Sequence, residues 1–409
     1  MRGLCTAAVA ALLVLGTASA AHAQLAVSAN DGKVKFVDGK VEAEKSPRPD
    51  TLAVIDMRAS PPKVLAEIEV PHSFAGPPTG VAVSPKEEIA LVTAGMQSDP
   101  ADPARQIPDD KLTVVDLTAL KPTLFGRLKS AVGVGQSKGP PPGPRVVATL
   151  QAGRGAAGVA INRAGTMALV ANRAEGTVSV FTINGKTVTA AGKVTVGNEK
   201  SGPSAIAFAP DGKSALVTCD GDHRIVVLSI EGDKVEAGKR EMSAGLRPYA
   251  IDIAAKGEAA VVGNAGTGSG DADTISVIDL KADPPRVVNT YTVGPSPNGV
   301  KFSPDGKFLA VTLVNGTNRP AGSPFYKDSG LLQVWSRNGT QLTKSGELPI
   351  GKWCQGVAWT SNNKTLLVQC MGDEEISVIR FSGLAGRSLQ KMGSIKTNGA
   401  PAGIRTAEP

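Results

Sequence analysis

The chain has 409 residues, of which 41% are hydrophobic, 20% are charged and 4% are aromatic, and its formal net charge is +7. By length alone it could hold about two or three domains. The positive charges are spread along the chain, and no dense basic run is interleaved with aromatic residues, which argues against a nucleic-acid-binding protein.

The first residues have the pattern of an export signal. Arg2 gives a short basic region, residues 7–15 are apolar, and residues 21–23 (Ala-His-Ala) form a cleavage motif. The apolar stretch is shorter than the roughly 20 residues that a membrane span needs, and no other stretch could span a membrane. We therefore expect a signal peptide over residues 1–23, cleavage after Ala23, and a periplasmic or secreted mature protein.

The mature chain begins with short strand patterns at residues 25–28, 51–56 and 63–70, and the polar stretch 30–50 is expected to be a long loop. Further on, a unit of a short alternating strand, a tight turn and a second strand recurs. Its clearest turn is Ser-Pro-Asp-Gly-Lys at residues 303–307, where proline presets φ, aspartate bonds back to the backbone and glycine takes the left-handed position.

The unit occurs seven times, and most copies are 45 to 57 residues apart, with 78 residues between the first two. The first strands are anchored at Val81, Val159, Ile206, Ile251, Val300, Val357 and Ile404. A period in the forties with about four strands per unit is typical of a β-propeller. We predict one all-β domain over residues 24–409, a seven-bladed β-propeller with four-stranded antiparallel blades.

Two insertions lengthen the first unit, at residues 96–110 and 119–144, and the unit at Val300 carries a long loop over 315–330. The last copy, at residues 402–406, is a first strand with nothing after it, whereas the N-terminal strands lack a first strand. We predict that the two chain ends complete one blade, because this closure leaves no open sheet edge.

Two cysteines fall opposite each other in a predicted hairpin. When the unit at Val357 is aligned on its turn, Cys354 pairs with Cys370, and we predict a disulfide, since an exported protein meets an oxidising environment. Cys219 has the matching place in an earlier unit, opposite Pro203. We expect Cys219 to be a free, half-buried thiol without a catalytic role.

These repeats resemble the YVTN family of β-propellers, which lies close to the lactonase-like seven-bladed propellers. The best matches are Leu-Val-Ala-Asn at 169–172 with Gly-Thr-Val-Ser-Val at 176–180, and Asp-Thr-Ile-Ser-Val-Ile-Asp-Leu at 273–280. The resemblance covers essentially the whole mature chain. It implies the fold and says little about function, because the matched residues are strand and turn residues.

In a propeller, the loops before each first strand and between the second and third strands ring one mouth of the central channel, which is the default binding site. Their arginine and lysine side chains favour an anionic ligand through charge-assisted hydrogen bonds, and the alternative is a solvated rim that binds nothing. The candidate ligand-binding residues are Arg154, Asn172, Arg173, Asp220, His223, Arg247, Tyr249, Asn264, Asn298, Asn315, Lys352 and Trp353.

The sequence offers little for a metal centre. Asp220, Asp222 and His223 could form a metal or acid–base cluster, but only two histidines remain after signal cleavage, so a tight turn is the better interpretation. Asp271 and Asp273 could hold Ca²⁺ through oxygen ligands, although their spacing matches no EF-hand. We predict no cofactor, with Ca²⁺ as the alternative.

Three functions are compatible with this pattern. The first is a non-catalytic, exported and monomeric propeller that binds a small anionic ligand or a protein partner. The alternative is a lactonase-like hydrolase of a sugar-type lactone, for which no catalytic residue can be named. The third is a scaffold whose loops at 96–110 and 315–330 dock a partner.

Overall fold

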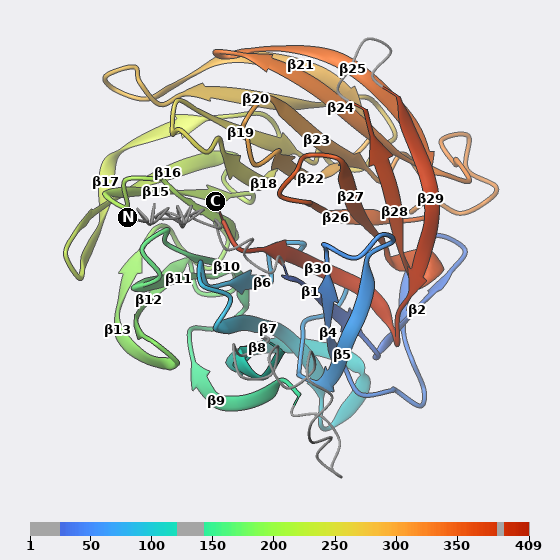
Figure 1. The fold of residues 1–409 in the computed structure, drawn as a ribbon, viewed down its shortest axis with the longest axis horizontal. Coiled ribbons are helices and arrows are strands. Elements are labelled where there is room, and N and C mark those ends of the chain that lie inside the picture. Colours follow the sequence, from blue (N-terminus) through green and yellow to red (C-terminus); the bar gives the residue numbers. More distant parts are fainter. Residues whose placement is uncertain (1–24, 121–142, 383–387, 409) are drawn as a thin grey trace, which may run out of the picture.

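The computed structural model describes residues 25–120, 143–382 and 388–408. Seven four-stranded antiparallel sheets stand as blades around a central axis (Figure 1). Apart from strands, the described residues contain only two short 3₁₀ turns, η1 (Thr118–Leu120) and η2 (Met371–Asp373). The predicted all-β, seven-bladed propeller is confirmed.

Blades 1 to 6 each use four consecutive strands, which run from the channel outwards. Blade 1 has β6 (Val81–Val83), β7 (Ile89–Asp99), β8 (Asp102–Asp116) and β9 (Arg145–Gln151). Blade 2 has β10 (Ala156–Ile161), β11 (Met167–Asn172), β12 (Thr177–Asn184) and β13 (Thr187–Thr195). Blade 3 has β14 (Pro203–Phe208), β15 (Ser214–Cys219), β16 (Arg224–Glu231) and β17 (Lys234–Ser243).

The next three blades repeat this order. Blade 4 has β18 (Pro248–Ile253), β19 (Ala259–Asn264), β20 (Asp273–Asp279) and β21 (Arg286–Gly294). Blade 5 has β22 (Pro297–Phe302), β23 (Phe308–Leu313), β24 (Gly330–Asn338) and β25 (Gln341–Ile350). Blade 6 has β26 (Cys354–Trp359), β27 (Thr365–Cys370), β28 (Glu375–Phe381) and β29 (Leu389–Lys396).

Blade 7 joins the two ends of the chain. Its strands, from the channel outwards, are β30 (Ala400–Thr406), β1 (Leu25–Asp31), β4 (Thr51–Asp56) and β5 (Lys63–Glu69). The antiparallel register places Val27 opposite Arg405 and Ser28 opposite Ile404. The predicted closure is therefore confirmed. The predicted signal peptide lies outside the described residues.

Two segments predicted as irregular are hairpins. Within residues 30–50, β2 (Val34–Val37) pairs with β3 (Lys40–Ala43) across Asp38 and Gly39, both of which have positive φ. An Asp-Gly pair between strands favours such a two-residue turn, so the sequence itself carries a signal for this hairpin. Residues 96–110 were predicted as an insertion between strands, but they prolong β7 and β8, with Met96 opposite Pro108.

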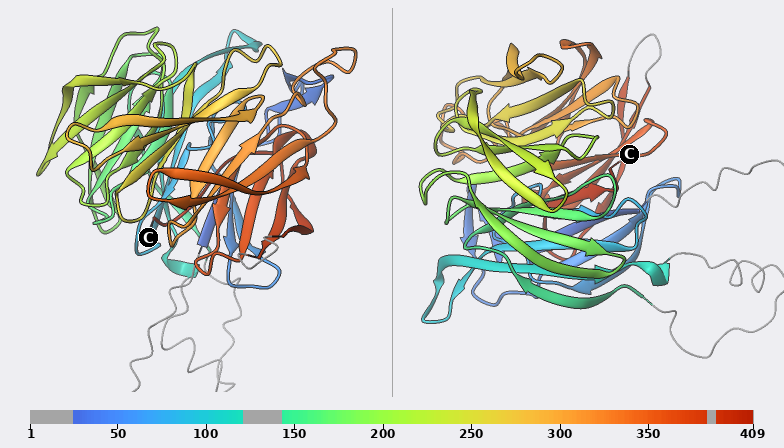
Figure 2. Two further views of the ribbon diagram at one scale, coloured as in Figure 1. Left: turned by 90° about the horizontal axis from the view of Figure 1, so that it is seen from above. Right: turned by 90° about the vertical axis from the view of Figure 1, so that its left-hand side faces the viewer.

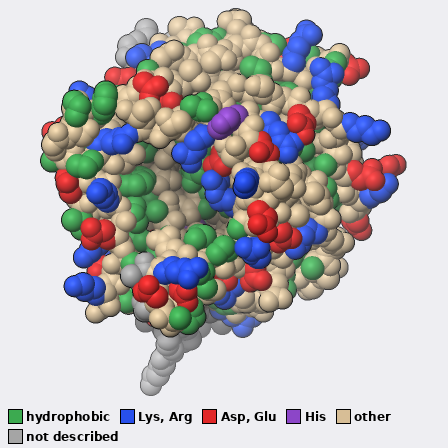
Figure 3. Space-filling model, turned by 180° about the vertical axis from the view of Figure 1, so that it is seen from behind, with side chains coloured by type: hydrophobic (Ala, Val, Ile, Leu, Met, Phe, Trp, Pro, Cys, Tyr) green, Lys and Arg blue, Asp and Glu red, His purple; other side chains and the backbone are tan. Residues whose placement is uncertain are grey.

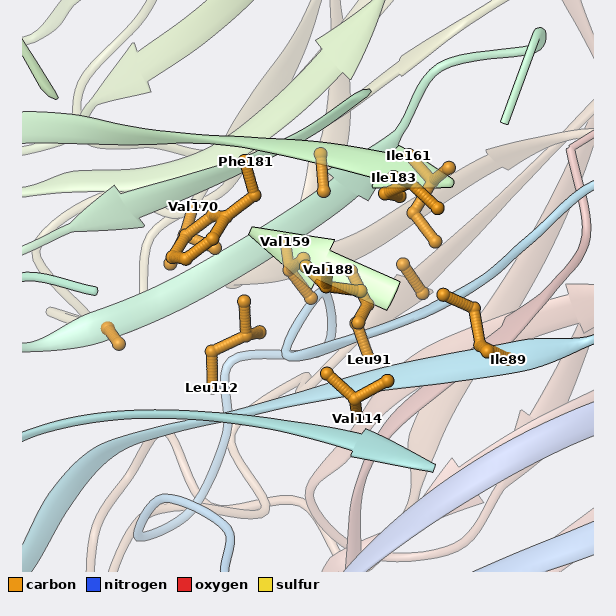
Figure 4. Close-up of a cluster of buried hydrophobic side chains, with 13 residues drawn as sticks. Ile89, Leu91, Leu112, Val114, Val159, Ile161, Val170, Phe181, Ile183 and Val188 are labelled. Carbon is orange, nitrogen blue, oxygen red and sulfur yellow. The ribbon is translucent and has the colours of Figure 1, made fainter. Parts of the chain in front are cut away.

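The blades hold together through apolar side chains between their faces, because a single blade cannot bury both of its faces. Figure 4 shows Leu91 and Leu112 of blade 1 pointing toward Val159 and Phe181 of blade 2, in a cluster that is at most 7% exposed. Burying each side chain of this size is worth about 1.5–3 kcal/mol.

The predicted disulfide is present. Cys354 and Cys370 face each other across β26 and β27 and form an S–S bond. Cys219 is free and lies opposite Pro203, as expected, but it is fully buried rather than half-buried. Burial raises the pKa of the Cys219 thiol to about 12, so it stays protonated at neutral pH.

Two faces of the ring are distinguished below. The upper face carries the loops that precede the inner strands, and the lower face carries the turns that follow them. The C-terminus lies on the lower face, as the side view shows (Figure 2). Within the described ranges, no helix is long and apolar enough to cross a membrane.

Candidate functional site

A cavity of about 680 Å³ opens at the channel mouth on the upper face, and we call it the upper cavity. Blades 2, 3 and 4 supply most of its lining, and the rest comes from residues 73–77, which connect β5 to β6, and from Gly95, Met96 and Pro108 of blade 1. Figure 3 views the face opposite to the C-terminus and shows a central hollow with apolar side chains inside and lysine and arginine side chains around it.

Asn172, at the end of β11, fixes the backbone next to this cavity. Its Oδ1 accepts the N–H of Gly153 at 3.0 Å, and its Nδ2 donates to Thr177 and Ser179 at 2.8 and 2.9 Å. The side chain is 0% exposed. The structure thus places this candidate ligand residue inside the blade, where it holds the start of the loop that carries Arg173.

Asn264 plays the same part in blade 4. Its Oδ1 accepts the N–H of Gly245 at 3.0 Å, and its Nδ2 donates to Thr274 and Ser276 at 3.0 and 2.9 Å. The two asparagines occupy equivalent positions of the repeat, and the side chains of both make their hydrogen bonds within their own blade. Neither lines the upper cavity.

Asp220 connects two arginines on the cavity wall. Its Oδ2 lies 2.8 Å from Nη1 of Arg173 and 3.9 Å from Nη2 of Arg247, and Asp220 itself is 1% exposed. Burial on its own lowers the pKa of the Arg173 guanidinium, but the charge and the hydrogen bond of Asp220, together with Tyr249, outweigh burial and raise it. Two cations therefore share one buried anion, which leaves the wall with a net positive charge.

His223 and Tyr249 complete this group. The backbone N–H of Arg247 donates to Nδ1 of His223 at 3.2 Å, so the neutral imidazole carries its proton on Nε2. Both His223 and Arg247 have left-handed backbone conformations, with φ of 58° and 54°. Burial raises the pKa of Tyr249 to about 12, and its hydroxyl remains a donor at neutral pH.

Sequence analysis missed two charged residues of the upper cavity, Glu199 and Lys200. They lie in the loop that precedes β14, so the rule that selected the other entry loops would also have found them. Arg154, by contrast, lies outside the lining, and its Nη1 reaches Oε1 of Glu199 at 3.4 Å from the rim.

The remaining candidates do not join this group. Lys352 and Trp353 line a separate pocket of about 160 Å³, beside the β2–β3 hairpin. Asn315 donates to the carbonyl of Ser329 at 2.9 Å, within the loop at 315–330. Asn298 lies half-buried on β22 and lines neither pocket. The predicted ring of ligand residues is thus divided, with five members at one cavity.

The described residues contain no group of three or more histidine, cysteine, aspartate or glutamate side chains placed to hold a metal ion. Of the two candidate calcium ligands, Asp273 accepts the N–H of Ser296 at 2.8 Å, and Asp271 is fully exposed and accepts a hydrogen bond from Ser269. Calcium at this loop stays a prediction.

The segment that leads into β6 separates the upper cavity from the lower half of the channel. The carbonyl of Ala75 accepts a hydrogen bond from Gln355 at 3.1 Å, and the carbonyl of Pro78 accepts the N–H of Ile404 at 3.3 Å. Residues 73–77 line the upper cavity, whereas Thr79 lines a chamber below it. Substrate-sized molecules in the upper cavity would therefore enter from the upper face.

Comparisons with known proteins fit the geometry. Residues 143–245 match the family described as "Lactonase, 7-bladed beta-propeller". This segment contains blades 2 and 3, and with them Arg173, Asp220 and His223. No curated protein matches the sequence at a significant level.

Several solved structures share the fold. The periplasmic gluconolactonase of Pseudomonas aeruginosa is 14% identical, with a TM-score of 0.65 over 94% of this chain and 99% of its own. A candidate 6-phosphogluconolactonase of Bacteroides uniformis is 17% identical, with a TM-score of 0.64 over 94% and 100%. Hydrazine synthase of Kuenenia stuttgartiensis is 19% identical, with a TM-score of 0.53 over 76% and 78%. The predicted resemblance to lactonase-like seven-bladed propellers is confirmed at the level of the fold.

Proposed function

We propose that the protein is a hydrolase that opens a sugar-type lactone in the upper cavity. The observation that carries the proposal is the convergence of Arg173, Asp220 and Arg247 on one wall of this cavity. The match of residues 143–245 to a lactonase family supports it, since two of these three side chains come from that segment. These findings favour the hydrolase, the alternative of the sequence analysis, over a non-catalytic binding module.

Lactone hydrolysis requires groups that stabilise the negative charge that develops on the carbonyl oxygen. Water adds to the lactone carbonyl carbon, the carbonyl oxygen becomes an oxyanion, and the ring C–O bond then breaks to give a hydroxy acid. The guanidinium groups of Arg173 and Arg247 are donors for this oxyanion. Asp220 lies between them and is a positioning residue, because it holds both guanidinium groups in place.

Proton transfers complete the reaction. Glu199 is the lining carboxylate that we assign to accept a proton from the attacking water, because Asp220 is engaged by the two arginines. The departing ring oxygen needs a proton, and the Nε2–H of His223 or the hydroxyl of Tyr249 can donate it. Lys200 adds positive charge at the opening, and such a wall attracts anionic substrates.

The test is acid release from glucono-δ-lactone by the chain that starts at Gln24, measured in a pH-stat against spontaneous hydrolysis. We expect Arg173→Met and Arg247→Met each to lower kcat by about 10²–10³, the usual effect of losing an oxyanion donor. Arg286→Gln, a change of an exposed arginine at the start of β21, is the matched control. A wild-type rate equal to the spontaneous rate would refute the proposal.

Two further parts of the proposal concern the cell and the cofactor. We propose a monomeric protein that acts in the periplasm or outside the cell after removal of residues 1–23, and N-terminal sequencing of the exported protein checks the cleavage site. We also propose that the reaction needs no metal, so a chelator should leave the rate unchanged. Loss of activity in chelator would instead favour the calcium alternative.

A further inference from the structure

Three charged residues of the lower channel stand at one position of the repeat. The residue that follows the anchor of each inner strand is alanine in four blades, namely Ala82, Ala160, Ala207 and Ala358. In the other three blades it is charged, namely Asp252, Lys301 and Arg405. Because burying a charge is costly unless it is paired, these three departures from alanine need a reason.

Six of these seven residues, all except Ala358, line a chamber of about 270 Å³ at the lower mouth, and we call it the lower chamber. Its walls are mainly apolar, and they include Val83, Ile161, Phe208, Ile253, Phe302 and Trp359. Residues 73–79 separate it from the upper cavity. The lower chamber is therefore a second site rather than an extension of the first.

Lys301 and Asp252 form a buried ion pair in this chamber. Nζ of Lys301 lies 2.9 Å from Oδ1 of Asp252, and Oδ2 of Asp252 accepts the N–H of Phe302 at 2.7 Å. Lys301 and Asp252 are each 6% exposed. Asp252 takes only one of the three ammonium donors of Lys301, so Nζ can bind a further acceptor.

The further acceptor is the carboxylate of Glu408, whose two oxygens lie 2.6 and 2.7 Å from Nζ of Lys301. Glu408 follows β30 of blade 7, so the last residues reach across the lower mouth to blade 5 (Figure 1). Ala407 bridges to Val83 of blade 1 on the way. The Glu408 side chain is 42% exposed, in contrast to the buried pair.

Further cations surround this carboxylate. Arg405 and Arg163 line the same chamber. Burial raises the pKa of Glu408, but the charges of Lys301, Arg405 and Arg163 together lower it below its usual value. Without Glu408, three cations would face two anions, Asp252 and Glu87, so one positive charge would stay unmatched, and the chamber has one anion position that a terminal segment fills.

We propose that the lower chamber is a ligand site for a small carboxylic acid with an apolar body, and that the Glu408 carboxylate occupies the position that the ligand's carboxylate takes. The cations would bind the acid group, and the apolar walls would bury the hydrocarbon part. A neutral alcohol of the same length lacks the charge that this end of the chamber selects. The inference is independent of the proposed lactone hydrolysis.

The test is calorimetric titration of octanoate into the chain that starts at Gln24, with 1-octanol as the uncharged probe. Glu408 competes as a tethered carboxylate at high effective concentration, so Glu408→Gln should bind octanoate about tenfold more tightly than the wild type. Octanol should bind both proteins weakly and equally. Glu231→Gln, which removes an exposed carboxylate on β16, is the control and should match the wild type.

A second variant removes Lys301, the cation that binds the carboxylate, together with Asp252, so that no unpaired charge is left buried. The double change Asp252→Asn with Lys301→Met is neutral overall, and its melting curve verifies that it folds. It should lose octanoate binding even when combined with Glu408→Gln. Equal octanoate affinity of wild type and Glu408→Gln, or undiminished binding by the triple variant, would overturn the proposal.

Discussion

Nη1 of Arg173 lies 2.8 Å from Oδ2 of Asp220, although the two residues belong to neighbouring blades. The pair joins the loop after β11 to the loop after β15 on the wall of the upper cavity. Because Arg247 of blade 4 approaches the same oxygen, one carboxylate holds guanidinium groups from two other blades. The first prediction follows from this arrangement.

Asp220→Asn should lower kcat for lactone hydrolysis more than it raises KM, because the arginines keep their charges but lose the anion that aligns them. We expect a loss of about tenfold to a hundredfold in kcat, smaller than that for either arginine variant. Steady-state rates over a range of lactone concentrations separate the two constants. A change in KM alone would show that Asp220 serves binding and does not align the arginines.

His72 should make stability depend on pH between 6.5 and 4. Burial, and then the charge of Lys33, lower the pKa of His72 from 6.5 to about 4. Below pH 6.5, His72 binds a proton in the unfolded chain but not in the folded protein. The stabilising contribution is therefore complete above pH 6.5 and is lost as the pH falls toward 4, by about 3 kcal/mol in total.

Urea unfolding at pH 7, 6, 5 and 4.5 measures this slope. The ring donates through Nδ1 to the carbonyl of Thr93 at 3.0 Å, and His72→Asn retains a donor there. The substitution also changes the absolute stability, so the comparison is of slopes. An unchanged slope in His72→Asn would assign the pH dependence to other groups.

The disulfide should stabilise blade 6 and with it the whole ring. Cys354 and Cys370 are 16 residues apart. Closing a loop of this size in the unfolded chain stabilises the folded state by about 3 kcal/mol. Reductant should therefore lower the urea midpoint of the wild type. It should have no effect on the variant with both cysteines replaced by serine, and Cys219→Ala should respond to reductant like the wild type.

The closure of blade 7 should be sensitive to its innermost strand. Ile404 is 0% exposed and pairs with Ser28. Ile404→Ala should cost about 2–5 kcal/mol of unfolding free energy, the range for removing a large buried aliphatic group. Val288→Ala, at a position that is 38% exposed on β21, should cost much less. Equal losses in the two variants would contradict a closure that the terminal strand holds.

The architecture was predictable because residues within the repeat unit itself determine its turn. In blade 5, Phe308 N–H bonds to Oγ of Ser303 at 3.0 Å, Lys307 N–H bonds to Oδ1 of Asp305 at 3.0 Å, and Gly306 has a φ of 68°. A turn that is fixed locally sets the register of its strands. The same register predicts from sequence that Cys354 lies opposite Cys370, as it does in the structure.

The site was predictable only in part. Position in a loop selected Arg173, Asp220 and Arg247, whose mutual contacts depend on the packing of neighbouring blades. It also selected Asn172 and Asn264, because a polar residue at a strand end looks the same in sequence whether it faces the channel or holds its own blade. The contact of Glu408 with Lys301 joins residues that are 107 positions apart, and it forms only in the closed ring. No local sequence pattern could therefore predict it.

The structure of the protein crystallised with gluconate, the acid that glucono-δ-lactone yields, tests the proposed hydrolase most directly. The account predicts that the gluconate carboxylate lies in the upper cavity, within hydrogen-bond distance of the guanidinium group of Arg173 or Arg247. Gluconate bound elsewhere on the protein, with the upper cavity free of it, would contradict the account.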